Sequence, residues 1–510
     1  MTFRHLGLVV LCAWQAVIAA PIEPQVVVPG GWIEGVRDDD GLKRYLGVPY
    51  ATPPVGDRRW APTSSVTAWE GVRPAREHGP QCLQPEPLNP FYASNRRNQS
   101  EDCLTLNVWT RATSTDARLP VMVWFHGGAL LEGAGELYPG DALTRKGVIL
   151  VTVNYRLGPL GFFAHPELSE EGGGYSGNQG YRDQIASLEW VRDHIEGFGG
   201  DPSNVTIFGE SAGSWAVNLL QASPLVRSLF HKAIGQSGAR LLPLSELRQD
   251  RPWARSAEDR GLNLADQWAR SRGASLAELR GISGREIIAG YEASPELFWD
   301  FDALTIVDGE VLEEQIYTTL VAGRQADIPL LLGSNEDEGI AFDVDMLEPE
   351  TAAQIDHRSK LEAAIKTQLP ELEFVQRDAL YPSDDRLAAR ESYIRFQTDV
   401  AFTQPLRQWA ELMVNVPSPA YLYWWDWHPV IRFPGVERQP TVIAAEASPH
   451  PSIAVAARRV TSSRTDLVAF HAAEIPYVFG TLGPAGSFAF EEEEEEEEAE
   501  RVWFWPNVSF

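Results

Sequence analysis

The chain has 510 residues, of which 44% are hydrophobic, an ordinary share for a globular enzyme. Its formal net charge of −28 at pH 7 disfavours nucleic acid and anionic membranes as partners. The sequence has no internal repeat and no linker rich in Ser, Gly or Pro, so we expect a single large domain over residues 21–484.

The first twenty residues have the pattern of a signal peptide. Arg4 and His5 form a short polar start, residues 6–18 are mostly apolar, and two small alanines suited to cleavage follow. The apolar stretch is short for a membrane span, which needs ~20 residues, and no other stretch is long and apolar enough. We therefore predict that residues 1–20 are removed and that the protein is secreted or exported, extracellular or periplasmic, without stable membrane insertion. A membrane anchor is the alternative.

Three cysteines limit the redox chemistry of the chain. Cys12 lies in the predicted signal peptide, which leaves Cys82 and Cys103. An even pair in an exported protein predicts one disulfide bond. Two buried thiols are the alternative.

The predicted elements alternate as an α/β protein requires. Apolar, β-branched and aromatic runs predict strands over residues 44–48, 105–109, 121–125, 148–154, 205–208, 330–332 and 420–425. Helical spacing predicts helices over residues 184–195, 257–290 and 358–412. We therefore expect a large, mostly parallel central sheet flanked by helices. The stretch 485–510 contains an unbroken run of Glu at 491–498, which predicts an acidic, solvated low-complexity tail.

Ser211 has the sequence context of a catalytic nucleophile. An apolar run over residues 204–208 leads directly into G-E-S-A-G at 209–213, and apolar residues at helical spacing follow. A strand, this motif and a helix place the serine on a sharp turn that requires small neighbours, with its hydroxyl exposed above the sheet. The N–H of Ala212 then faces the developing oxyanion. A glycine-bounded turn with a capping serine is the alternative.

A second glycine-rich loop follows the predicted strand at residues 121–125. Hydrolases with such a nucleophile turn take another N–H donor from a loop after an early strand, and glycines let the backbone approach the substrate carbonyl. We expect Gly127 and Gly128 to be oxyanion donors, with Ala212 as the third. A plain Gly-Gly turn is the alternative. His126, which precedes the pair, fits a structural role better than a catalytic one.

Position alone leaves the acid open and favours His471 only mildly as the base. In the α/β-hydrolase fold the chain order is Ser, acid, His. Four histidines lie downstream of Ser211, namely His357, His428, His450 and His471. The predicted strand at 330–332 runs into a loop that carries three carboxylates, Glu336, Asp337 and Glu338.

Several segments together resemble the type-B carboxylesterase/lipase family, which includes the cholinesterases. The resemblance covers roughly residues 27–480. It lies above all in G-N-Q-G at 177–180, F-G-G-D-P at 198–202 and G-E-S-A-G at 209–213. Other matching segments are Y-L-G-V-P-Y-A at 45–51, S-E-D-C-L at 100–104, Q-S-G at 236–238 and V-D-G at 307–309. The family implies the α/β-hydrolase fold.

The resemblance also implies residue roles. The family's acid is the Glu of its D-E-G motif, which is Glu338 here. Its base precedes an element that ends like P-Y-V-F-G at 476–480, which makes His471 the base. The first disulfide of the family falls on Cys82 and Cys103. Positions that match its supporting polar residues are Glu210, Ser237 and Glu474.

Some positions depart from the family pattern. Ala129 stands where the oxyanion loop usually has a third glycine, and Ala93 lies near the position of the Trp that holds choline in cholinesterases. A cholinesterase is therefore not expected. Trp299 and Phe301 fall about where the family walls its acyl pocket, which predicts a small acyl group.

The sequence thus predicts a serine carboxylesterase that hydrolyses small-molecule esters through Ser211, His471 and Glu338. An acyl-enzyme forms on the serine, and no cofactor or metal is needed. An amidase on the same fold is one alternative. A non-catalytic adhesion or binding protein of the same family is another, although such relatives usually lack a member of the triad.

Overall fold

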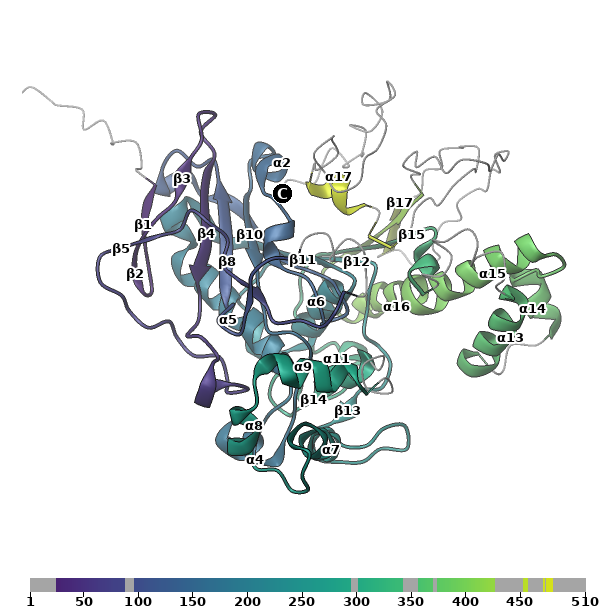
Figure 1. The fold of residues 1–510 in the computed structure, drawn as a ribbon. Coiled ribbons are helices and arrows are strands. Elements are labelled where there is room, and N and C mark those ends of the chain that lie inside the picture. The colour runs from purple at the N-terminus through teal and green to yellow at the C-terminus, as the bar shows by residue number, and fades with distance from the viewer. Residues whose placement is uncertain are drawn as a thin grey trace, which may run out of the picture.

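The computed structural model describes residues 24–87, 96–294, 301–342, 356–369, 374–426, 453–456, 471–472 and 474–479. Its largest element is a ten-stranded sheet in the order β17-β16-β15-β12-β11-β9-β10-β8-β4-β3 (Figure 1). The strands are β3 (Val36–Arg37), β4 (Lys43–Pro49), β8 (Thr105–Thr110), β9 (Leu119–Phe125), β10 (Ile149–Val153), β11 (Gly200–Glu210), β12 (Lys232–Gln236), β15 (Leu330–Asn335), β16 (Ala420–Trp425) and β17 (Ile453–Ala456).

Pairing in this sheet is mostly parallel. From β10 through β9, β11, β12, β15 and β16 to β17, every neighbouring pair is parallel. Strands β8, β4 and β3 add an antiparallel end. The expected α/β-hydrolase fold, with a large mostly parallel sheet flanked by helices, is confirmed.

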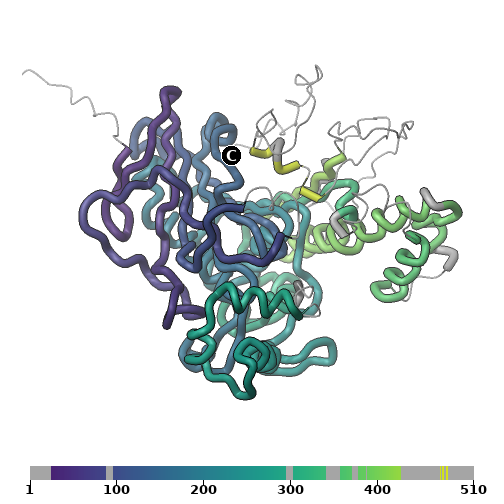
Figure 2. Tube along the Cα trace, in the orientation of Figure 1, coloured from purple at the N-terminus to yellow at the C-terminus, as the bar shows by residue number. Residues whose placement is uncertain are grey.

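In the described part of the chain, three smaller sheets accompany the large one. The first contains β1 (Gln25–Val28), β2 (Gly31–Glu34) and β5 (Val72–Pro74). The others pair β6 (Gln81–Cys82) with β7 (Gln99–Ser100) and β13 (Ser245–Glu246) with β14 (Ile306–Val307). The purple first sheet and the green helices α13 to α15 lie at opposite sides of the molecule in Figure 2.

Helices cover the sheet and extend beyond it. They are α2 (Asp141–Arg145), α3 (Gly158–Gly161), α4 (Pro166–Glu171), α5 (Gln179–His194), α6 (Ala212–Ala222), α7 (Ala257–Ala269), α8 (Leu276–Gly281), α9 (Gly284–Glu292), α11 (Ile316–Val321), α13 (His357–Gln368), α14 (Phe374–Leu380), α15 (Arg386–Thr398), α16 (Gln404–Leu412) and α17 (Ile475–Phe479). None of the helices in the described ranges is long and apolar enough to span a membrane.

The helical stretch predicted over residues 257–290 is three helices, α7, α8 and α9. Capping explains the breaks. Ser275 is the N-cap of α8, and Ser283 is the N-cap of α9. Each forms a reciprocal capping box with the Glu three residues later. The first N–H groups of a helix have no partner within that helix, and a serine side chain accepts from one of them. A new helix can therefore begin after each of these serines.

The core lies on both faces of the parallel strands. Val121, Val123 and Phe125 of β9 are buried, and so is every residue of β10. A parallel strand covered on both faces is apolar along nearly its whole length, and here β9 is apolar throughout while β10 has one polar residue, Thr152. Because neighbouring parallel strands end at the same edge of a sheet, the loops after β9, β11, β12 and β15 meet there.

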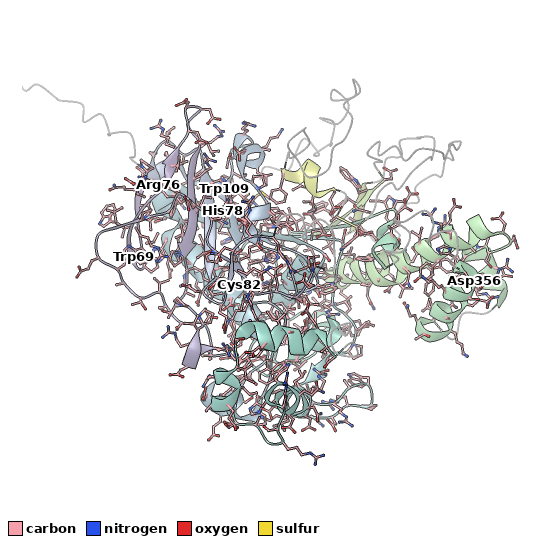
Figure 3. The ribbon with its side chains drawn as sticks, viewed as in Figure 1. Trp69, Arg76, His78, Cys82, Trp109 and Asp356 are labelled. Carbon is pink, nitrogen blue, oxygen red and sulfur yellow. A yellow bond between two sulfur atoms is a disulfide. The ribbon has the colours of Figure 1, made fainter. Side chains whose placement is uncertain are left out.

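The disulfide expected between Cys82 and Cys103 is present, with both cysteines buried. Cys82 lies in β6 and is labelled in Figure 3, as are His78 and Trp109, whose ring centroids are 6.2 Å apart. The predicted signal peptide, residues 1–20, and the predicted acidic tail, residues 485–510, lie outside the described residues. Both stay predictions, as does the boundary of the domain at residues 21–484.

Candidate active site

Ser211 occupies a sharp turn between β11 and α6. Its backbone has φ +55° and ψ −123°, a region that residues with a side chain rarely adopt. The flanking glycines make this turn sterically feasible. A Cβ on Gly213 would lie 1.9 Å from the carbonyl oxygen of Phe125, and one on Gly209 would lie 2.5 Å from the backbone of Gly213. The N–H of Ser211 donates to the carbonyl of Gln236, at the end of β12, over 2.8 Å.

The loop after β9 lies against this turn. A Cβ on Gly127 would lie only 3.0 Å from Cβ of Ser211. Gly128 has φ +97°, and Ala129 follows at φ +55° despite its side chain. The N–H groups of Gly127, Gly128 and Ala212 donate to no acceptor within the described part of the chain. Three free donors beside a serine form the kind of cluster that stabilises an oxyanion.

His471 lies between two carboxylates. Its Nδ1 is 2.6 Å from Oε2 of Glu338, and its Nε2 is 3.2 Å from Oε1 of Glu210. Glu338 is fully buried, and its second oxygen accepts the N–H of Asn335 over 2.7 Å. The ring of Phe402 packs on the imidazole, with centroids 4.8 Å apart. Histidine and acid are therefore fixed together, as a base and its orienting group must be.

The serine itself is not bonded to the histidine in this arrangement. Among the described residues, no hydrogen bond joins the hydroxyl of Ser211 to His471. The imidazole nitrogen that would accept the serine proton faces the carboxylate of Glu210, the residue immediately before the serine. Proton transfer from Ser211 therefore requires His471 Nε2 to leave Glu210.

Glu474 extends the buried network. One of its oxygens accepts from Nε2 of Gln236 over 3.2 Å, and the other accepts from Nδ2 of Asn335 over 2.6 Å. Asn335 thus contacts Glu474 through its side chain and Glu338 through its backbone. Gln236 likewise joins Glu474 to the turn, because its carbonyl accepts the N–H of Ser211.

Asn335 and Gln236 were not predicted as site residues. Asn335 lies in the loop expected after the strand at 330–332, and Gln236 lies in the Q-S-G segment that resembles the family, but neither position indicates a contact with a carboxylate. Each becomes informative only when the sheet order places β12 and β15 side by side.

Burial and like charge shift the titration of this cluster. Burial raises the pKa of Glu210 and of Glu474 above the ordinary range, because the charged form loses its water. For His471, burial alone lowers the pKa. The carboxylates of Glu210 and Glu338 outweigh burial and raise the pKa of His471 above its usual value. Ionised Glu210 therefore stabilises the imidazolium form.

Other predicted residues fall outside this network. Ser237 directly follows Gln236 in the chain. Its hydroxyl is buried and forms no hydrogen bond with any described residue. Trp299 is not among the described residues, and Phe301 is described only as part of a 3₁₀ turn, Phe301–Leu304. Of the alternative bases, His357 packs on Tyr393 in the α13 to α15 region. The remaining candidates, His428 and His450, lie outside the described residues.

No group of three or more His, Cys, Asp or Glu side chains among the described residues is arranged to hold a metal ion. The chemistry assembled here consists of one hydroxyl, one imidazole, buried carboxylates and free backbone donors. These groups can perform acyl transfer without help from a bound ion.

Comparison with known proteins identifies the family of the chain. The model of the carboxylesterase family matches residues 22–507. The chain belongs to the carboxylesterase family, and its members named below hydrolyse esters. It is 35% identical to fumonisin B1 esterase of Sphingopyxis macrogoltabida, over 92% of this chain and 77% of that one. It is also 35% identical to para-nitrobenzyl esterase of Bacillus subtilis, over 89% of this chain and 82% of the other.

Solved structures of this carboxylesterase family show the same fold. The carboxylesterase of Geobacillus stearothermophilus aligns with a TM-score of 0.68 at 27% identity, covering 94% of this chain and 87% of that one. A pNB esterase aligns with a TM-score of 0.69 at 32% identity, covering 90% and 84%. The protein is an enzyme of this type-B carboxylesterase family.

The contact between Glu210 and His471 predicts a pH effect. If His471 is the base, hydrolysis needs its neutral form, so the rate falls as pH drops through the pKa of His471. In Glu210→Gln the anion that stabilises the imidazolium is gone, so the pKa of His471 falls. We expect the acidic limb of kcat/KM to move to lower pH by about one unit or more. Measuring kcat/KM against pH tests this.

Glu314→Gln is the control for the pH experiment, because Glu314 pairs with Arg324 at the surface, away from the cluster. Its pH profile should match that of the wild type. An acidic limb that stays in place in Glu210→Gln, or moves to higher pH, would show that Glu210 does not act on His471.

Proposed function

We propose that the protein is a serine carboxylic-ester hydrolase that acts on small-molecule esters through a Ser211–His471–Glu338 triad and an acyl-enzyme. The observation that carries this proposal is the 2.6 Å contact of His471 Nδ1 with buried Glu338, which turns Nε2 toward the Glu210–Ser211 turn. Family membership supports the same chemistry. The names of the relatives, such as fumonisin B1 esterase and cocaine esterase, describe esters of small molecules.

In the proposed first half-reaction, the oxygen of Ser211 attacks the carbonyl carbon of the ester. His471 Nε2 leaves Glu210 and takes the serine proton, and the carbonyl electrons move to the oxygen. The N–H groups of Gly127, Gly128 and Ala212 bind this oxyanion. Collapse of the intermediate expels the alcohol, which leaves with the proton from His471.

In the second half-reaction, water attacks the acyl-enzyme and passes a proton to His471. Collapse releases the carboxylic acid and returns the proton to Ser211. Glu338 holds the imidazole in the tautomer with a proton on Nδ1 and stabilises the imidazolium. No cofactor enters either step.

We also propose that the enzyme acts outside the cytoplasm, in an extracellular or periplasmic space. The disulfide between Cys82 and Cys103 supports this location, because such bonds persist in oxidising compartments. The predicted signal peptide at residues 1–20 points the same way.

Replacement of the nucleophile tests the triad. Ser211→Ala should abolish ester hydrolysis and labelling by a fluorophosphonate, because that hydroxyl forms both covalent bonds. Glu338→Gln should lower kcat by about 10³- to 10⁴-fold, because the amide favours the wrong tautomer of His471. Ser203→Ala, at an exposed serine near Asp201, is the control and should keep wild-type kinetics. A binding protein without activity would show no labelling at all.

A panel of acyl groups tests the predicted acyl pocket. If Trp299 and Phe301 wall that pocket, acetyl and butyryl esters should have higher kcat/KM than long-chain esters, since a narrow pocket excludes the longer chains. Rates with Ser211→Ala serve as the blank. Matched amides included in the panel separate an esterase from an amidase. A preference for long acyl chains would contradict the predicted pocket and leave the triad untouched.

A further inference from the structure

Two aromatic side chains lie directly behind the oxyanion loop. His126 and Tyr155 are both buried, and their rings stack with centroids 4.5 Å apart and planes within 21°. The hydroxyl of Tyr155 donates to the carbonyl of His126 over 2.7 Å. The Nδ1 of His126 lies 2.8 Å from the carbonyl oxygen of Gly127. Both bonds therefore reach backbone carbonyls of the loop.

Each of these carbonyls shares a peptide unit with a proposed oxyanion donor. The carbonyl of His126 and the N–H of Gly127 belong to one planar unit, and the described residues include no cis peptide. In a trans peptide the C=O and the N–H point in opposite directions. By holding the carbonyl of His126, Tyr155 fixes the N–H of Gly127 in the direction away from the Tyr155 hydroxyl.

The same geometry applies one residue later. His126 holds the carbonyl of Gly127, which fixes the direction of the N–H of Gly128. A carbonyl only accepts hydrogen bonds, so the proton must be on Nδ1 of the imidazole. Burial lowers the pKa of His126 to about 4, which keeps the ring neutral with a single proton. In the described part of the chain, Nε2 of His126 is buried without a hydrogen-bond partner. The hydrogen bond of this ring is therefore the one from Nδ1 to the carbonyl of Gly127.

The surrounding chain makes room for this ring. Gly133 has φ +112°, and a Cβ there would lie 2.3 Å from Nδ1 of His126. The third donor has an equivalent support, because the carbonyl of Ser211 accepts the N–H of Trp215 over 3.0 Å and so fixes the N–H of Ala212. Glycines at 127 and 128 permit many peptide orientations. The side chains behind them select one.

We propose that Tyr155 and His126 are positioning residues of the oxyanion hole, each orienting one donor peptide through its carbonyl. The proposal rests on the proposed function, in which Gly127 and Gly128 bind the oxyanion. In this role His126 affects the chemical step through the backbone of the oxyanion loop and does not contact the substrate.

Removal of one hydroxyl tests the first contact. Tyr155→Phe keeps the ring that stacks on His126 and loses the bond to its carbonyl. We expect kcat to fall on the order of ten-fold with little change in KM, because the direction of the Gly127 N–H matters once the oxyanion forms. Thr110→Val is the control. The buried Thr110 hydroxyl also donates to a backbone carbonyl, that of Phe198, over 3.1 Å, and its loss should leave kcat unchanged.

A pair of substitutions tests the second contact. The side-chain N–H of Asn can take the place of Nδ1–H, whereas Leu offers no donor. His126→Leu should lower kcat on the order of 10²-fold, the scale of a lost oxyanion donor, and His126→Asn should recover most of that loss. Thermal melting of each variant shows whether it folds. If both His126 variants fail to fold, the Tyr155→Phe and Thr110→Val pair decides the question.

A trifluoromethyl ketone inhibitor gives an independent readout. Ser211 adds to its carbonyl carbon, His471 takes the serine proton, and the negative charge stays on the former carbonyl oxygen. Affinity for the ketone therefore reports on oxyanion binding, whereas affinity for the matching secondary alcohol does not. We expect Tyr155→Phe to weaken ketone binding by about the factor by which it lowers kcat/KM, with alcohol binding unchanged.

Two results would overturn the positioning role. One is Tyr155→Phe with wild-type kcat and ketone affinity, and the other is equal loss in His126→Leu and a folded His126→Asn. Ser211→Ala, measured in parallel, separates this failure from that of the proposed function. Full turnover in Ser211→Ala would refute the triad itself. An inactive Ser211→Ala beside a fully active Tyr155→Phe would refute only the role of Tyr155 and His126.

Discussion

The backbone of Ser211 is held at φ +55°, and the rest of the site depends on that turn. Such a conformation costs on the order of 1–3 kcal/mol, so neighbouring contacts must maintain it. Bonds from Ser211 N–H to Gln236 and from Trp215 N–H to Ser211 supply them. Because Gly209 and Gly213 have no side chain, the start of the oxyanion loop and the start of α6 can pack closely against the turn. The same turn presents the hydroxyl, starts α6 and directs the N–H of Ala212.

Charge burial is the second constraint on the site. Glu210, Glu338 and Glu474 are buried around a single imidazole, His471. Buried carboxylates are costly unless they are hydrogen-bonded or paired with positive charge. Donors from Asn335 and Gln236 bond two of them, and an imidazolium at His471 would offset the remainder. The cluster therefore favours the charged histidine, which in the proposed mechanism is the form that develops as Ser211 attacks.

The parts of the site that could be predicted from sequence are local in the chain. The turn at Ser211 and the glycine loop at 127–128 each lie between a strand and the next element. Their small residues are required by the tight backbone at these points, so the local sequence alone predicts both features. Glu338 and His471 were different. Position did not separate the three carboxylates and favoured His471 only mildly among the four histidines, so family resemblance made both choices. The structure joins these two residues, 133 positions apart, through tertiary packing that no local pattern encodes.

Other features could not be predicted because they arise from contacts between distant elements. The contact of His471 with Glu210 depends on side-chain placement across the site. Asn335 and Gln236 contribute because β12 and β15 are neighbours in the sheet. The break of the predicted helix at 257–290 was encoded locally, by Ser275 and Ser283 with their Glu partners, but serines in helical stretches are too common to mark a boundary alone.

The central claim is that ester hydrolysis passes through a covalent bond to Ser211. The most direct measurement is acid quenching of the enzyme during turnover of an activated ester, followed by mass spectrometry of its peptides. The account predicts that the peptide containing Ser211 gains the mass of the acyl group, and that the modification maps to that serine. Turnover with an unmodified Ser211 peptide, or with the acyl group on another residue, would contradict it.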